Sequence, residues 1–208
     1  MKQKPKWLKI AIAQGIAAPF IFTCVAFIGG LLYPGYSHTS QAISELSANG
    51  ASNQRWLLVA FALTELQKIV FGVGFYSAVW DMGRALKGSA LSMIAIGVIG
   101  LGFAKFPMDQ IGTPVTFDGQ MHIAIVSISA VLATIAITLS GVGWRFVPGG
   151  KALVRWSFSM LAIMVASGML SGLAIAIEWP RVGIWQRVNI AAFSIWQIAT
   201  AIYLLRRV

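Results

Sequence analysis

Six long runs of apolar residues alternate with short polar segments along this chain. An α-helix of roughly 20 apolar residues crosses about 30 Å of hydrocarbon, and each run is close to that length or longer. Because every backbone group inside lipid must find its partner within the structure, runs of this length are helices. The predicted spans cover residues 10–32, 56–79, 88–104, 122–144, 156–177 and 188–205.

The pattern predicts an all-α, polytopic membrane protein in which residues 1–208 form one six-transmembrane-helix bundle. The first run lacks the short apolar core and small-residue cleavage site of a secretory signal peptide, so we expect it to remain as the first helix. Composition agrees with this class: 58% of the residues are hydrophobic and 11% are charged. Soluble domains carry about a quarter charged residues.

The distribution of basic residues between the loops predicts the orientation of the chain. Cytoplasmic loops are enriched in Lys and Arg, which makes both termini cytoplasmic in a multi-pass protein of the cell membrane. The net charge of +10 is spread over short loops without a basic face, so no nucleic-acid partner is predicted. The basic residues assigned to the cytoplasm are Lys2, Lys4, Lys6, Lys9, Arg84, Lys87, Arg145, Lys151, Arg155, Arg206 and Arg207, against Arg55, Lys105, Arg181 and Arg187 outside.

Polar residues gather in the three loops predicted to face outward, which in a bacterium means the periplasm. Residues 40–48 are expected to form a short helix capped by Ser40, with Ile43 and Leu46 turned into the mouth of the bundle. Since the loops of a six-helix bundle converge on a small area, we predict that four residues form one cluster beside Ser44. They are His38, Glu45, Asp109 and His122.

Several chemistries are open to these residues. A zinc ion bound by His38, Asp109 and His122 would support a metal-dependent hydrolase. Ser44, His122 and Asp109 could instead act as a catalytic triad, although no nucleophile elbow marks the serine. A haem between the two histidines is disfavoured, because His38 lies in a loop. Alternatively, the histidines only hydrogen-bond the loop backbone. Whether the protein is an enzyme stays open.

Two charged residues lie near the middle of the second predicted helix. Glu65 and Lys68 are three positions apart and can pair along one face, with Gln197 as a candidate neighbour. Ionisable groups at this depth are costly and are usually paired. The pair serves either a proton or substrate path or helix packing alone.

The fifth predicted helix contains Gly168 and Gly172 in a GxxxG pattern. Small residues at this spacing let helix backbones approach closely in lipid. The pattern favours packing within the chain, with a homo-oligomer through this helix as the second interpretation.

Four elements of the sequence together resemble an uncharacterised family of six-helix membrane proteins, domain-of-unknown-function family 998. They are Tyr33-Pro34, Ile43-Ser44-Glu45-Leu46, Phe106-Pro107-Met108-Asp109 and His122. The first-loop pattern also resembles the DRAM/Frag/Sfk group, which is implicated in lipid organisation. The resemblance implies a six-helix bundle with an outward polar site built from the first two outward loops.

The functional expectation is an integral membrane protein that binds a lipid or another amphiphile at its outward face. An anionic head would meet Arg55, Arg181 or Arg187, and the chain would lie against the helices. A metal-dependent hydrolase using the same site is the first alternative. A structural partner subunit without chemistry is the second.

Overall fold

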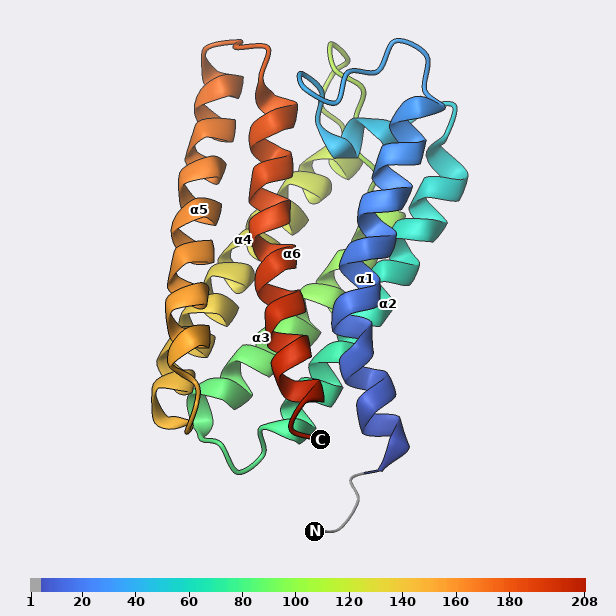
Figure 1. The fold of residues 1–208 in the computed structure, drawn as a ribbon. Coiled ribbons are helices and arrows are strands. Elements are labelled where there is room, and N and C mark those ends of the chain that lie inside the picture. The colour runs from blue at the N-terminus through green and yellow to red at the C-terminus, as the bar shows by residue number, and fades with distance from the viewer. Residues whose placement is uncertain (1–4) are drawn as a thin grey trace.

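The structure, a computed structural model, describes residues 5–208, which form six long helices and three short 3₁₀ helices without any strand. All six long helices are apolar and long enough to cross a membrane, which confirms the predicted all-α fold of a multi-pass membrane protein. The elements are α1 (Lys6–Leu31), η1 (Ile43–Ser47), α2 (Gln54–Ala78), α3 (Arg84–Gly100), η2 (Leu101–Ala104), α4 (Phe117–Gly143), η3 (Trp144–Phe146), α5 (Lys151–Ala176) and α6 (Val182–Leu205) (Figure 1).

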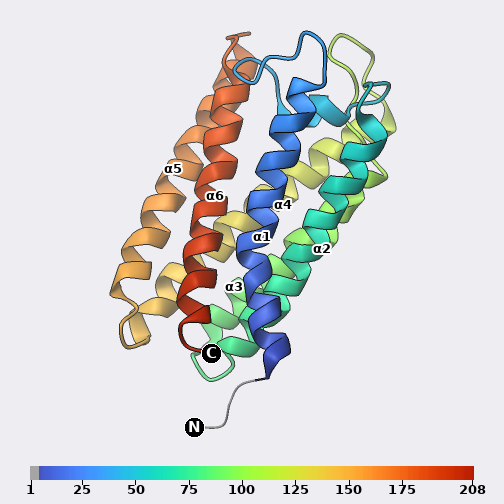
Figure 2. The same cartoon turned by 45° about the vertical axis from the view of Figure 1, so that its right-hand side comes forward.

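The helices form a bundle in which sequence neighbours pack together, and α1 also packs against α6. The start of α1 and the C-terminus lie at one end of the bundle (Figure 1). The opposite end, called the distal end from here on, carries the three loops 32–53, 105–116 and 177–181. Loop 32–53 reaches from the distal end of α1 across to the distal end of α6 in both views (Figures 1 and 2).

All six long helices begin two to six residues earlier than the apolar pattern predicts, and the difference matters most for α4 and α6. α4 begins at Phe117, because the Thr116 hydroxyl accepts a hydrogen bond from Gly119 N and caps the helix. α6 begins at Val182, so Arg187 lies in a helix and not in the loop where the sequence placed it. A search for apolar runs misses the first turns of these helices, because those turns contain polar residues. Such residues can lie in a helix when their polar groups form hydrogen bonds with neighbouring loops.

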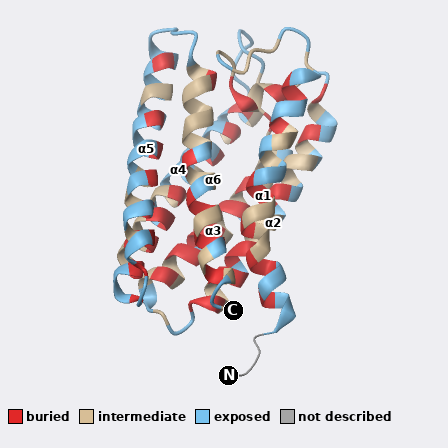
Figure 3. Cartoon of the chain, in the orientation of Figure 1, coloured by how far each residue is buried: buried red, intermediate tan, exposed pale blue. Residues whose placement is uncertain are grey.

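The buried side chains form two clusters of unequal size. The larger one fills the bundle and includes the fully buried Trp144, Trp196, Phe71 and Phe75. The smaller one lies beneath loop 32–53 and consists of Ala26, Ile43, Leu46 and Leu57. Figure 3 shows that α5 is mainly exposed along its outer side. Large apolar side chains cover much of this outer surface, as expected for helices that face lipid.

The centre of the bundle depends on a close approach of α1 to two other helices. A Cβ atom at Gly15 would lie 2.6 Å from the Phe71 ring of α2 and 2.8 Å from Cβ of Ala201 in α6. Both neighbours are fully buried. Glycine is therefore required here for the three helices to pack at this distance.

We expect Gly15→Ala to lower the stability of the purified protein in detergent by roughly 1–3 kcal/mol, because the methyl group overpacks a dense interior. Gly172→Ala is the matched control, since a Cβ there has no atom within 4 Å. Thermal unfolding of the two variants measures the difference. Equal unfolding temperatures for the two variants would contradict the packing described for Gly15.

Candidate functional site

Arg187 fastens the first distal loop to α6. Its Nη1 donates to the carbonyl oxygens of Gln41 and Gly183, both at 3.0 Å. Its Nη2 donates to Tyr36 Oη at 2.7 Å and to His38 Nδ1 at 3.1 Å. These bonds use the four N–H groups of the terminal nitrogens and leave only Nε–H. Among the described residues no carboxylate forms an ion pair with this guanidinium, so its charge is not neutralised within the chain.

Further hydrogen bonds order the loop around η1. Glu45 Oε1 accepts from Ala42 N at 2.6 Å, and Oε2 accepts from Gln41 Nε2 at 2.9 Å. Ile43 N donates to Gln186 Oε1 of α6 at 2.6 Å. The predicted helix 40–48 is thus shortened to a 3₁₀ turn stabilised by Glu45 and not capped by Ser40. Its apolar residues Ile43 and Leu46 are buried, as the sequence predicted.

His38 is held in a single tautomer by its contact with Arg187. An arginine can only donate, so Nδ1 accepts and the proton of the neutral ring is on Nε2. The ring stacks on Phe27 at 5.5 Å between centroids, and Nε2 is buried without a partner. Burial, and then the charge of Arg187, hold the pKa of His38 below its usual value. The histidine is therefore a neutral component of the loop at neutral pH.

A cavity of about 360 Å³ lies beside this loop, between α1 and α6. Its walls are mostly apolar, and its charged boundary is formed by Arg187, with His38 next to it. Ligand-binding cavities usually combine such apolar walls with a few polar groups that orient the ligand. The residues around it are Phe22, Thr23, Ala26 and Phe27 of α1, His38 and Ile43 of the loop, and Arg187, Ile190, Ala191 and Ser194 of α6.

Asp109 organises the second distal loop above the start of α4. Its carboxylate accepts from Thr116 N and Thr116 Oγ1, both at 2.8 Å. These two bonds, followed by a weaker contribution from Asn49, hold the pKa of Asp109 below its usual value. Asn49 N also donates to Met108 O at 2.8 Å, which joins the first loop to the second. Asp109 therefore stabilises the loop and the positive end of the α4 dipole.

His122 carries the opposite tautomer from His38. Its Nδ1 lies 3.0 Å from Phe106 O, and a carbonyl can only accept, so Nδ1 carries the proton. The lone pair on Nε2 is then buried without a partner, and the Phe103 ring lies 4.9 Å away between centroids. This is the arrangement in which a histidine can act as a ligand or base, but it needs further groups to do so.

The predicted cluster of four residues is divided between these two loops. His38 belongs to the Arg187 group, while Asp109 lies near His122. Within residues 5–208 no group of three or more His, Cys, Asp or Glu side chains could hold a metal ion. His122 bonds to Phe106 and makes no hydrogen bond with Ser44, so the serine triad is not formed in this structure.

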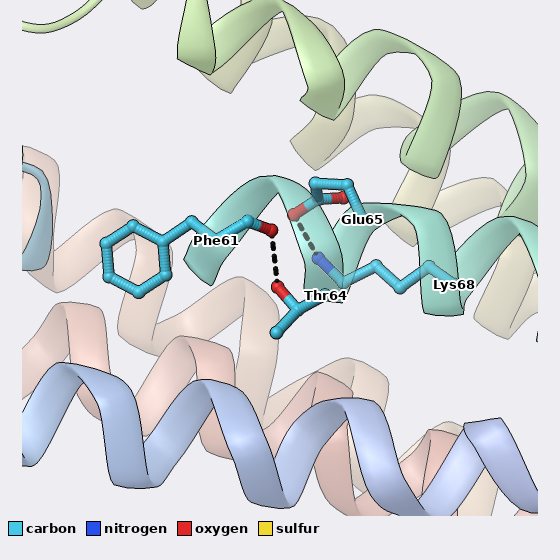
Figure 4. A network of polar contacts seen from close by, with 4 residues as sticks. All are labelled: Phe61, Thr64, Glu65 and Lys68. Atoms are coloured by element: carbon cyan, nitrogen blue, oxygen red, sulfur yellow. Dashed lines mark hydrogen bonds and ion pairs between the residues drawn. The ribbon is translucent and has the colours of Figure 1, made fainter. Parts of the chain in front are cut away.

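The intramembrane charges form an ion pair within α2. Lys68 Nζ lies 2.6 Å from Glu65 Oε1, and the Thr64 hydroxyl donates to Phe61 O at 2.7 Å (Figure 4). Glu65 is buried against Gly100 of α3, where a Cβ atom would collide with its carboxylate. The second carboxylate oxygen, Oε2, has no hydrogen-bond partner.

The profile of the family described as "Protein of unknown function (DUF998)" matches residues 16–203. The chain belongs to the DUF998 family. No curated protein and no solved structure matches it. The resemblance of its first loop to the DRAM/Frag/Sfk group stays a prediction.

Some partners in this DUF998 protein differ from those that the sequence suggested. Gln197 donates to Gly15 O of α1 at 3.2 Å and does not join the ion pair. Tyr36 was not predicted as a site residue, and no local pattern marks it, because its partner lies in the last helix.

The three arginines proposed as alternatives for binding an anionic head lie in different places. Arg187 borders the cavity between α1 and α6, whereas Arg55 lines a different groove along α2. Arg181 is exposed just before α6 and lines neither. Of the GxxxG pair, Gly168 faces Asn189 of α6 and Gly172 faces open space. Of these two glycines, only Gly172 is therefore open to a helix of a second copy, as the homo-oligomer prediction requires.

We expect Glu65→Gln or Lys68→Met alone to lower the stability of this DUF998 protein by about 3–5 kcal/mol, because each leaves an uncompensated charge in the bundle. The double variant should lose less stability than either single variant, because it leaves no unpaired charge. Thermal unfolding and the yield of monodisperse protein provide the measurement. Effects that simply add would show that the two charges do not stabilise each other.

Proposed function

We propose that this protein binds an anionic amphiphile of the membrane, such as a lipid, in the cavity between α1 and α6. The observation that carries the proposal is an apolar cavity bordered by an arginine without a carboxylate partner. The acyl chain would lie against the apolar walls. The head would lie beside the guanidinium of Arg187 and the ring of His38.

The electrostatics of the cavity favour a negative head. The terminal nitrogens of Arg187 donate all their N–H groups to loop 32–53 and to the Gly183 carbonyl of α6, which fixes the guanidinium in place without neutralising it. The pKa of the neighbouring His38 is lowered by burial and by Arg187, so the histidine adds no second charge at neutral pH. An anion would therefore meet one fixed positive charge beside mostly apolar walls.

The shape and lining of the cavity favour an acyl chain. Its volume of about 360 Å³ falls within the roughly 300–1,000 Å³ range of small-molecule sites. Phe22, Phe27 and Ile190 supply apolar surface, and the cavity lies between two helices that face lipid. A membrane lipid could reach such a site sideways from its own leaflet, without crossing water.

We further propose that both termini are cytoplasmic and that the distal end faces outward across the cell membrane. The support is the excess of Lys and Arg in the terminal segments and in the loops near them. The amphiphile would then come from the outer leaflet.

A dansyl-labelled fatty acid tests the cavity, with its methyl ester as the uncharged control. We expect the acid to bind more tightly than the ester. Ala191→Trp should weaken binding of the acid by at least about tenfold, since the indole fills the cavity and about 1.4 kcal/mol of lost contact suffices. Met169→Trp, at an exposed position of α5 outside the cavity, is the control and should bind normally. Equal binding of acid and ester, or equal loss in both variants, would end the proposal.

Cysteine labelling tests the orientation independently. In a Cys24→Ala background, Ser52→Cys at the distal end should react with an impermeant thiol reagent in intact cells or spheroplasts. Lys151→Cys at the opposite end should react only after the membrane is opened. Both positions are exposed, so access in the folded protein does not limit either reaction. The reverse pattern would place the distal end in the cytoplasm.

A further inference from the structure

A second groove runs along the outer face of α2, on residues separate from those of the α1–α6 cavity. Its volume is about 460 Å³, and its lining contains one charged residue, Arg55, at the distal end. The remaining lining is apolar: Leu58, Val59, Ala62, Leu63 and Leu66 of α2 and Ala104 of η2. These α2 positions recur every three or four residues and therefore share one face of the helix.

The packing of α3 explains why this face of α2 is uncovered. Gly97 and Gly100 bring α3 into close contact with α2 at Glu65 and Ile69. α3 then ends at Gly100, and the short η2 turn takes its place beside the distal half of α2. The outward side chains are left without partners in the chain: Val59 is 63% exposed and Leu63 is 55% exposed.

We propose that this groove binds an anionic glycerophospholipid, with its phosphate at Arg55 and one acyl chain along α2. Arg55 is exposed, and among the described residues it forms no ion pair. No acidic residue lines the groove. The unneutralised guanidinium and the apolar strip below it match the two parts of such a lipid.

The length of the groove agrees with this occupant. At a rise of 1.5 Å per residue, Arg55 and Leu66 are about 16 Å apart along the helix. The hydrocarbon core is about 30 Å thick, so the groove spans about one leaflet. The exposed ring of Trp56, adjacent to Arg55, suits the headgroup level where aromatic residues concentrate.

A second copy of the chain fits this face less well. A two-fold interface brings the same surface of both copies together, so the two Arg55 side chains would approach each other without an acidic partner. The negative charge that the groove lacks is supplied by a lipid phosphate.

Native mass spectrometry in an Ala191→Trp background tests this site alone, because the tryptophan fills the α1–α6 cavity. The probes are phosphatidylglycerol and phosphatidylcholine with the same acyl chains. The parent protein should retain phosphatidylglycerol preferentially. Arg55→Gln should reduce that preference about fivefold, which corresponds to roughly 1 kcal/mol for one basic residue near anionic lipid. Arg181→Gln is the matched control, because Arg181 is an exposed distal arginine outside the groove, and it should change little.

Leu63→Trp should reduce retention of both lipids, since it narrows the apolar strip without changing the charge. Equal effects of Arg55→Gln and Arg181→Gln would show general surface attraction and overturn the proposal. A third measurement uses Leu63→Cys in a Cys24→Ala background. Efficient disulfide-linked dimers in the native membrane would show that a second copy covers this face, and would also overturn it.

Discussion

The distal end of this protein is organised by the four hydrogen bonds that Arg187 donates. Three of them join α6 to loop 32–53, through the carbonyl of Gln41, the hydroxyl of Tyr36 and Nδ1 of His38, and the fourth goes to the Gly183 carbonyl within α6. The loop is thereby ordered over the ends of α1 and α6, and its buried residues Ile43 and Leu46 close the small apolar cluster beneath it. Two features of the proposed site follow from this anchoring: the single tautomer of His38 and the charged boundary of the cavity.

The charged side chains within α2 are paired, whereas two arginines at the distal end are not. Within α2, Lys68 and Glu65 neutralise each other, as expected where no water can stabilise an isolated charge. At the distal end, Arg187 and Arg55 have no acidic partner, and each borders apolar surface. A headgroup region supplies counter-charge that the hydrocarbon core cannot. This difference in surroundings is why the unpaired arginines are the candidates for recognition of an anion.

Much of the fold was accessible from the sequence because lipid imposes simple local rules. Apolar length predicts six helices, since a backbone in hydrocarbon must satisfy its own hydrogen bonds. The spacing of three residues between Glu65 and Lys68 predicts a contact along one helix, because helical geometry brings such positions together. The burial of Ile43 and Leu46 follows from the same preference of apolar side chains to leave water.

The distal site required the tertiary structure. Arg187 and His38 are separated by 149 positions, and no local period links them. In the sequence, Asp109 and His122 are polar residues of the outward loops just as His38 is. In the structure they lie at the second loop and have different hydrogen-bond partners. Which loops meet depends on where α1, α4 and α6 emerge from the bundle, and that is set by close contacts such as the one at Gly15. The periodicity of the helices does not determine these positions. The sequence could therefore place the polar residues at one end of the bundle, but it could not predict which of them contact each other.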